Sequence, residues 1–225
     1  MDERTKNGIG KASIALGVLL LASLVCVRVQ AVTVADVYER ASRSVVIIVA
    51  VAQQQDFIGQ GSGVVVSSDV VLTNCHVLKG ANDVGVYYQD QVYAAPKVLD
   101  SNVSRDLCLL SVPGLAAPAI QVGSTASLRV GEKVLAIGAP HGFDLGAELT
   151  LSEGLISSLR RNGGSFPIIQ TSAPISPGSS GGALLDDQGT LIGITTAGHA
   201  TGQNLNFAVP IDWARDFPAA NLPPD

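Results

Sequence analysis

Ser180 stands in the segment Gly178-Ser179-Ser180-Gly181-Gly182, where glycines surround the serine hydroxyl. Glycine lets the backbone turn tightly and leaves amide N–H groups pointing outward. Acyl transfer places negative charge on the former carbonyl oxygen, and N–H donors must be in place to stabilise it. The segment therefore predicts a nucleophile with an oxyanion hole formed by Gly178, Ser179 and Ser180, with the amides of Gly178 and Ser180 as the donors.

A base that activates Ser180 must be one of three histidines, His76, His141 and His199. His76 follows the apolar run 70–73 and is therefore fixed at the end of a strand, whereas the other two lie in turns. The base also needs a carboxylate on its far ring nitrogen. Asp106 precedes the apolar run 107–110 and fits that role, although a structural histidine and an exposed aspartate are the plain alternatives.

The order His76, Asp106, Ser180 separates the fold families that use this triad. Chymotrypsin-like enzymes have the order His, Asp, Ser, subtilisins Asp, His, Ser, and α/β-hydrolases Ser, Asp, His. Residues 178–182 also match the G-x-S-x-G elbow of α/β-hydrolases, but only His199 follows them and too little chain remains for such a sheet. The order therefore favours the chymotrypsin-like arrangement.

The elements that must position these residues are short strands. Runs rich in Val, Ile and Leu, most of them bounded by Gly, Asp, Asn or Ser, predict strands at 45–51, 63–67, 70–73, 84–88, 92–95, 107–112, 133–137, 149–157, 167–171, 183–185, 191–195 and 206–209. Residues 34–42 and 212–215 predict short helices, and 186–189 a hairpin turn. Residues 114–127 contain no charge and form an expected linker. The pattern predicts an all-β fold of two small barrels.

The sequence resembles the chymotrypsin-fold serine proteases, and more closely their HtrA/Deg-type branch. The matching segments are 61–65, 73–77, 105–107, 136–140, 170–171, 177–182, 191–194 and 206–210. The resemblance implies two six-stranded antiparallel β-barrels, the first at about 44–115 and the second at about 128–210. It places His76 and Asp106 on the first barrel and Ser180 on the second.

Several residues depart from the pattern of that family. Ser179 stands where HtrA-like enzymes usually have Asn and trypsin-like enzymes Asp, so activation by pairing a new N-terminus with that carboxylate is not expected. Ser172 and Pro174 are further departures near the specificity pocket. By resemblance, Ile175 and Ala197 line that pocket, and neither could pair with Lys or Arg of a substrate. We therefore expect cleavage after small or medium aliphatic residues, with loose selectivity.

Residues 1–31 predict an export signal. Arg4, Lys6 and Lys11 precede the uncharged run 12–27, and residues 29–31 suit cleavage after Ala31. The alternative is an uncleaved membrane anchor, and in either case 32–225 is an exported protease domain in the periplasm or outside the cell. We expect a protease domain without the PDZ domain that many HtrA relatives carry. The resemblance also implies a homo-oligomer, namely a trimer. In this sequence only the short helix at 34–42 supports it.

Composition argues against other classes of partner. The formal net charge is −5 and the largest basic cluster is Arg160-Arg161, so nucleic-acid binding is not expected. Three His and three Cys without C-x-x-C or H-x-x-x-H spacing predict no metal site, and we expect no cofactor. In the exported part, Cys75 and Cys108 form either a disulfide or two buried thiols.

Together these features predict an exported serine endopeptidase that cuts exposed or misfolded polypeptides through an acyl-enzyme. The alternative is a protease-like binding or chaperone protein whose oxyanion loop is held in an inactive conformation. The same acyl-enzyme chemistry would also serve small esters. Turnover of an unfolded polypeptide distinguishes an enzyme from a protein that only binds it.

Overall fold

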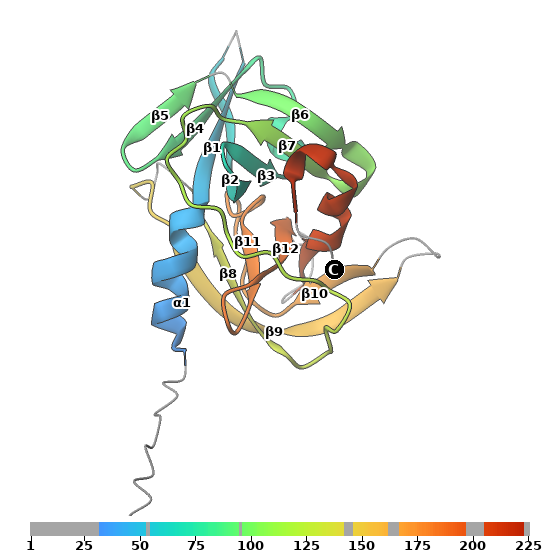
Figure 1. Ribbon diagram of the computed structural model, residues 1–225. Coiled ribbons are helices and arrows are strands. Elements are labelled where there is room, and N and C mark those ends of the chain that lie inside the picture. The colour runs from blue at the N-terminus through green and yellow to red at the C-terminus, as the bar shows by residue number, and fades with distance from the viewer. Residues whose placement is uncertain are drawn as a thin grey trace, which may run out of the picture. The chain divides into compact units, whose positions relative to one another are not determined.

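The computed structural model describes residues 32–52, 55–94, 96–141, 146–161, 167–196 and 205–222 (Figure 1). The expected signal segment, with its apolar run 12–27, lies outside these residues, as do Ala197 and His199. Among the helices of the described ranges, none combines the length and apolar character needed to cross a bilayer.

The described chain begins with helix α1 (Val34–Ala41), which continues as the 3-10 turn η1 (Ser42–Ser44). Thr33 caps the helix, because its hydroxyl accepts a hydrogen bond from the Asp36 amide at 3.1 Å and the Asp36 carboxylate accepts one from the Thr33 amide at 2.9 Å. The Thr33 hydroxyl also donates to the Asp36 carboxylate at 2.7 Å, and this bond, together with the one from the Thr33 amide, lowers the pKa of Asp36. The predicted helix at 34–42 is therefore confirmed to within a residue.

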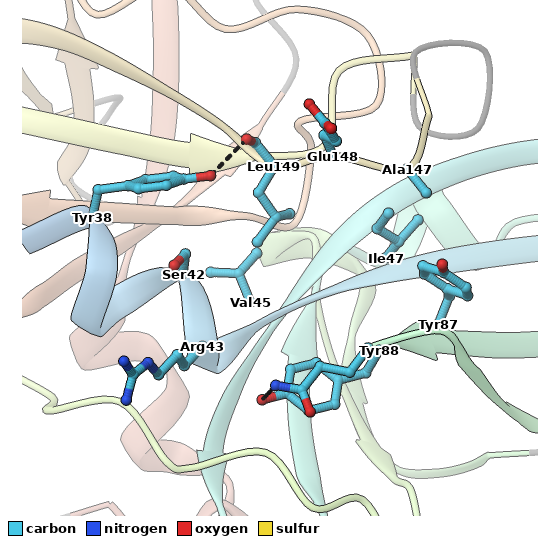
Figure 2. Close-up of a pocket in the computed structure, with 11 residues that line it drawn as sticks. Tyr38, Ser42, Arg43, Val45, Ile47, Tyr87, Tyr88, Ala147, Glu148 and Leu149 are labelled. Atoms are coloured by element: carbon cyan, nitrogen blue, oxygen red, sulfur yellow. Dashed lines mark hydrogen bonds between the residues drawn. The ribbon is translucent and has the colours of Figure 1, made fainter. Parts of the chain in front are cut away.

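Helix α1 ties the two halves of the fold together. Val37 is fully buried, and the Tyr38 hydroxyl donates to the carbonyl of Leu149, directly before the second-half strand β9 (Thr150–Arg161), at 2.9 Å. Figure 2 shows Tyr38 and Leu149 at one side of a pocket of about 320 Å³. Residues from η1 and from strands of the first half form its other walls.

The first half is a seven-stranded antiparallel sheet. Its strands are β1 (Val45–Ala52), β2 (Gln55–Ser67), β3 (Val70–Thr73), β4 (Asp83–Tyr88), β5 (Gln91–Ala94), β6 (Lys97–Asn102) and β7 (Leu107–Ser111). They are hydrogen-bonded in the order β5-β4-β1-β2-β3-β7-β6. Strand β6 was not predicted from the sequence, because only Val98 and Leu99 among its six residues are apolar. In the structure both of these side chains are exposed.

The second half is a closed six-stranded barrel. Its strands are β8 (Lys133–Gly138), β9 (Thr150–Arg161), β10 (Pro167–Thr171), β11 (Ala183–Asp186), β12 (Leu191–Thr196) and β13 (Asn206–Pro210), in the order β10-β13-β12-β11-β8-β9. All six strands lie where the sequence predicted them. The predicted turn between β11 and β12 has Gly189 at φ +86°, where glycine avoids the steric cost of a Cβ.

The two halves share one hydrophobic core. Val64 and Leu72 from the first sheet belong to the same buried cluster as Leu135 and Leu185 from the barrel. The 3-10 turns η5 (Ile211–Asp216) and η6 (Pro218–Ala220) close this cluster with further apolar residues. The all-β, two-part fold expected from the sequence is confirmed.

The turn η3 (Val103–Arg105) also contacts η5 across the junction. The Arg105 guanidinium lies 5.4 Å from the centroid of the Trp213 ring and forms an ion pair with Asp216. Arg105 precedes Asp106 in the chain, so this contact fixes the backbone from which the Asp106 side chain extends.

Candidate active site

His76 and Asp106 are in direct contact. His76 lies in the turn η2 (Cys75–Leu78) just after β3, and Asp106 lies between η3 and β7. The ring Nδ1 of His76 is 2.7 Å from Asp106 Oδ2, and the His76 amide donates to Oδ1 at 2.9 Å. The carboxylate thus holds both the ring and the backbone of the histidine, which fixes the direction of the other ring nitrogen, Nε2.

Asp106 is held by several groups around it. Its backbone is left-handed, with φ +55°, and its carbonyl accepts from the Asn74 side-chain amide at 2.9 Å and from the Cys75 amide at 3.4 Å. The Thr196 hydroxyl, at the end of β12, donates to Asp106 Oδ2 at 3.3 Å. Sequence reasoning missed Thr196, because nothing in its neighbourhood indicates that β12 ends beside Asp106.

A disulfide joins Cys75 to Cys108. The sequence left open whether these residues were bonded or were separate buried thiols, and the structure has the bond. Cys75 is the residue before His76, and Cys108 lies two residues after Asp106. The bond therefore connects the two segments that carry the histidine and the aspartate, in addition to their hydrogen bonds.

Ser180 lies at the end of the turn 177–180, in which every carbonyl group is bound to a protein donor. The Pro177 carbonyl accepts from the His141 amide at 3.0 Å, and the Gly178 carbonyl from the Ser62 hydroxyl at 2.9 Å. The Ser179 carbonyl accepts from the Thr195 hydroxyl at 2.6 Å, and the Ser180 carbonyl from the Ser62 amide at 2.7 Å. Four successive peptide groups are therefore fixed in orientation.

The amides of the same turn alternate between bound and unbound. Ser179 donates to the Ser176 carbonyl at 3.0 Å, and Gly181 to the Thr195 carbonyl at 2.8 Å. Within the described part of the chain, the amides of Gly178 and Ser180 donate to no protein acceptor. Ser179, which we expected among the oxyanion-hole residues, therefore shapes the turn but offers no free amide there.

Two glycines allow this turn to pack closely. Gly178 has φ +92° and Gly181 φ +86°, the left-handed region that glycine adopts without strain. A Cβ at Gly178 would lie 2.6 Å from the Ala139 carbonyl oxygen, and one at Gly181 only 2.0 Å from the Ser62 carbonyl oxygen. The predicted need for glycine at these positions thus has a steric cause.

The Ser180 turn packs against the segment that carries His76. A Cβ at Gly61 would lie 2.6 Å from the side chain of Val77, the neighbour of His76, and 3.0 Å from the Ser180 carbonyl oxygen. Gly61 therefore separates the two segments by little more than the width of a backbone. The turn with Ser180 and the segment with His76, which is bonded to Asp106, thus lie on either side of Gly61.

Ile175 lines a pocket of about 170 Å³ beside the Ser180 turn. Ser179, Thr195 and Pro174 are among the other lining residues, and no carboxylate is among them. Pro174 and Ser172, which depart from the family pattern, both form hydrogen bonds beside this pocket. The Pro174 carbonyl accepts from the Ser152 hydroxyl at 2.7 Å, and the Ser172 hydroxyl accepts from the Leu155 amide at 3.0 Å. Ala197, the other expected pocket residue, lies outside the described residues.

Comparison with known proteins agrees with this arrangement. The family model described as "Trypsin-like peptidase domain" matches residues 61–194. A putative serine protease HhoB of Synechocystis is 39% identical over 172 residues, which are 73% of this chain and 40% of the relative. A probable periplasmic serine endoprotease DegP-like of Pseudomonas putida is 38% identical over 173 residues, 73% of this chain and 35% of the relative. The chain thus spans about two-fifths or less of the length of these relatives.

Solved structures give the same result. The HtrA-type protease AlgW with a tripeptide superposes with a TM-score of 0.71 at 34% identity, covering 81% of this chain and 61% of that one. The Rv3671c protease of Mycobacterium tuberculosis in its active form gives a TM-score of 0.73 at 26% identity, with 82% and 83% covered. The chain belongs to the trypsin-like peptidase family, and within it to the HtrA/Deg type.

Proposed function

We propose that this chain is a serine endopeptidase that hydrolyses polypeptides through a His76, Asp106 and Ser180 triad. The observation that carries the proposal is the pair of unbound amides at Gly178 and Ser180, in a turn whose carbonyls are all held by protein donors. An oxyanion hole requires N–H donors fixed before the reaction begins. This arrangement supports an enzyme over a protein that only binds polypeptides.

The reaction would follow the acyl-enzyme route. Ser180 Oγ attacks the peptide carbonyl carbon while His76 Nε2 takes the hydroxyl proton, and Asp106 holds Nδ1–H and stabilises the imidazolium. The amides of Gly178 and Ser180 bind the resulting oxyanion. His76 then gives the proton to the leaving amine as the C–N bond breaks. A water molecule, activated by His76, attacks the ester and releases the acid and free Ser180.

The substrates we propose are exposed or unfolded segments of exported proteins. The pocket at Ile175 offers apolar side chains and hydroxyls but no carboxylate, so it suits small or medium aliphatic residues. Export is supported by the relatives named as periplasmic endoproteases and by the disulfide, which persists in oxidising compartments. For the whole protein we propose cleavage of the signal after Ala31, with retention as a membrane anchor as the alternative, and assembly into a trimer.

Labelling with a fluorophosphonate, followed by mapping of the adduct, tests the nucleophile. We expect an adduct on Ser180 and hydrolysis of casein by the same preparation. Ser180→Ala should lose the adduct and lower turnover by about four to six orders of magnitude while remaining folded. Thr171→Val, which changes a buried hydroxyl elsewhere in the barrel, is the control for nonspecific damage.

Two results would contradict the proposal. Equal turnover by Ser180→Ala would show that another group performs the chemistry. Folded wild-type protein that binds casein without cutting it, and takes up no fluorophosphonate, would instead identify the chain as a binding protein of the same fold.

A further inference from the structure

Ser62 is a fully buried serine of β2 in the first sheet, yet most of its hydrogen bonds reach the second half of the fold. Its hydroxyl donates to the Gly178 carbonyl at 2.9 Å and accepts from the Ala139 amide at 2.9 Å. Its own amide donates to the Ser180 carbonyl at 2.7 Å. One residue thus contacts the segment after β8 and the carbonyl groups of both Gly178 and Ser180.

The position of Ser62 is itself fixed from the first sheet. The Thr73 hydroxyl, at the end of β3, donates to the Ser62 carbonyl at 2.7 Å. Strands β2 and β3 are paired through Val64 and Leu72, and both of these side chains are fully buried. The Ser62 hydroxyl is therefore presented to the Ser180 turn by a rigid part of the sheet.

The Ser62 hydroxyl helps to fix the peptide groups before and after Gly178, one of them directly and the other through a neighbouring segment. The peptide bond between Gly178 and Ser179 is held directly, because its carbonyl accepts from that hydroxyl. The preceding peptide is held by His141, whose amide donates to the Pro177 carbonyl at 3.0 Å. His141 follows Ala139 by two residues, and the Ala139 amide donates to the same Ser62 hydroxyl.

This arrangement decides where the Gly178 amide points. The N–H and C=O of a trans peptide point in opposite directions. With the Pro177 carbonyl turned toward His141, the Gly178 N–H must face away from that segment. Glycine has no Cβ to resist rotation, so without these two anchors the peptides on either side of Gly178 could turn and direct a carbonyl toward the oxyanion.

We infer that Ser62 is a positioning residue for peptide hydrolysis, and that its hydroxyl keeps the Gly178 amide directed at the oxyanion. This inference rests on the proposed function. Removing the hydroxyl leaves two backbone groups without their partner, the part-buried Gly178 carbonyl and the fully buried Ala139 amide. The peptide can still bind in the cleft, but the donor for the transition state is no longer held in place.

Ser62→Ala tests the inference by steady-state hydrolysis of a quenched fluorescent peptide derived from casein. Loss of a single oxyanion donor typically lowers kcat by 10²–10³-fold, so partial misplacement is expected to lower kcat by about 10–100-fold. KM is expected to stay within about twofold, because the interaction is made only in the transition state. The inhibition constant of a peptide aldehyde, whose hemiacetal resembles the intermediate, should rise in parallel with the loss in kcat.

Val66→Ala is the matched control, since Val66 is a buried apolar residue of the same strand and its side chain has no hydrogen-bonding group to lose. It is expected to lower stability but to keep wild-type kcat per folded molecule. Ser62→Cys replaces the hydroxyl by a somewhat larger thiol, which is a weaker donor and acceptor, and should give an intermediate kcat. If Ser62→Ala does not fold, Ser62→Cys carries the test.

The outcomes separate this inference from the proposed function. Active wild type with unchanged kcat and aldehyde inhibition in the Ser62 variants would overturn the inference alone. Equal losses of kcat in Ser62→Ala and Val66→Ala would overturn it as well, because the effect would then be one of general stability. Wild type without turnover or labelling of Ser180 would contradict the proposed function and this inference with it.

Discussion

Removing the Cys75–Cys108 disulfide measures how much stability comes from joining the His76 and Asp106 segments. The bond spans 33 residues of sequence. In the chain-entropy description, closing a loop of this size lowers the entropy of the unfolded chain by about 12.5 cal/mol/K, or about 3.7 kcal/mol at room temperature. For a chain of this size that corresponds to a drop in Tm of roughly 7–15 °C.

Activity is expected to respond much less than stability. The disulfide acts mainly on the unfolded ensemble, and in the folded protein two hydrogen bonds still join His76 to Asp106. At a temperature well below the transition, kcat of the double variant Cys75→Ala/Cys108→Ala is therefore expected within about threefold of wild type. Guanidinium unfolding followed by fluorescence, with peptide hydrolysis on the same samples, gives both quantities.

Two controls distinguish the bond from the substitutions. Reduction of the wild-type protein breaks the disulfide without substituting either residue. If the loss of stability comes from the bond, the reduced wild type should be as unstable as the double variant. Titration of residues 32–225, denatured and unreduced, should find no free thiol, because both cysteines of this part of the chain are bonded to each other. A loss of stability below about 1 kcal/mol, or two free thiols, would refute the reasoning.

Three further predictions rest on single contacts. Thr196→Val removes a hydroxyl bonded to Asp106 Oδ2, and because the two bonds to His76 remain, kcat for peptide hydrolysis should fall only about 3- to 10-fold; an unchanged kcat would contradict this role. Gly181→Ala places a Cβ 2.0 Å from the Ser62 carbonyl oxygen, so fluorophosphonate labelling of Ser180 should be abolished, and retained labelling would show that the turn can relax. Thr33→Ala removes the cap of α1 and should lower the guanidinium midpoint near neutral pH. Because bonds from Thr33 lower the pKa of Asp36, the ionised carboxylate stabilises the fold above its unfolded pKa and loses this effect as the pH falls through the lowered value. The difference between Thr33→Ala and wild type should therefore shrink in acid, and a difference independent of pH would argue against the cap.

The strands and the residues of the site were predictable to different degrees. Buried strands such as β8 and β12 are continuous apolar runs, and the sequence alone locates them. Strand β6 was missed because it is held at the sheet edge by backbone pairing with β7 and has almost no apolar pattern of its own. A strand that is stabilised mainly by hydrogen bonds to its neighbour needs no regular pattern of apolar residues, so its sequence does not identify it.

The same contrast holds at the site. His76, Asp106 and Ser180 were predicted from residue type and order, because the proposed chemistry needs those side chains. Thr196 and Ser62 act through single hydroxyls whose partners lie 90 and 116 residues away in the sequence. Serine and threonine are common in any strand, so only the folded arrangement distinguishes these two from the rest.

The division of the site between the two halves has a consequence for the time at which the protein becomes active. A chain that is synthesised and exported from its N-terminus completes the segment with His76 and Asp106 first, while Ser180 and Thr196 are still to come. The first sheet alone holds a base and a carboxylate but neither a nucleophile nor an oxyanion site. Hydrolysis would therefore begin only after β12 has docked, so the nascent chain would be protected from its own activity by the order in which it appears.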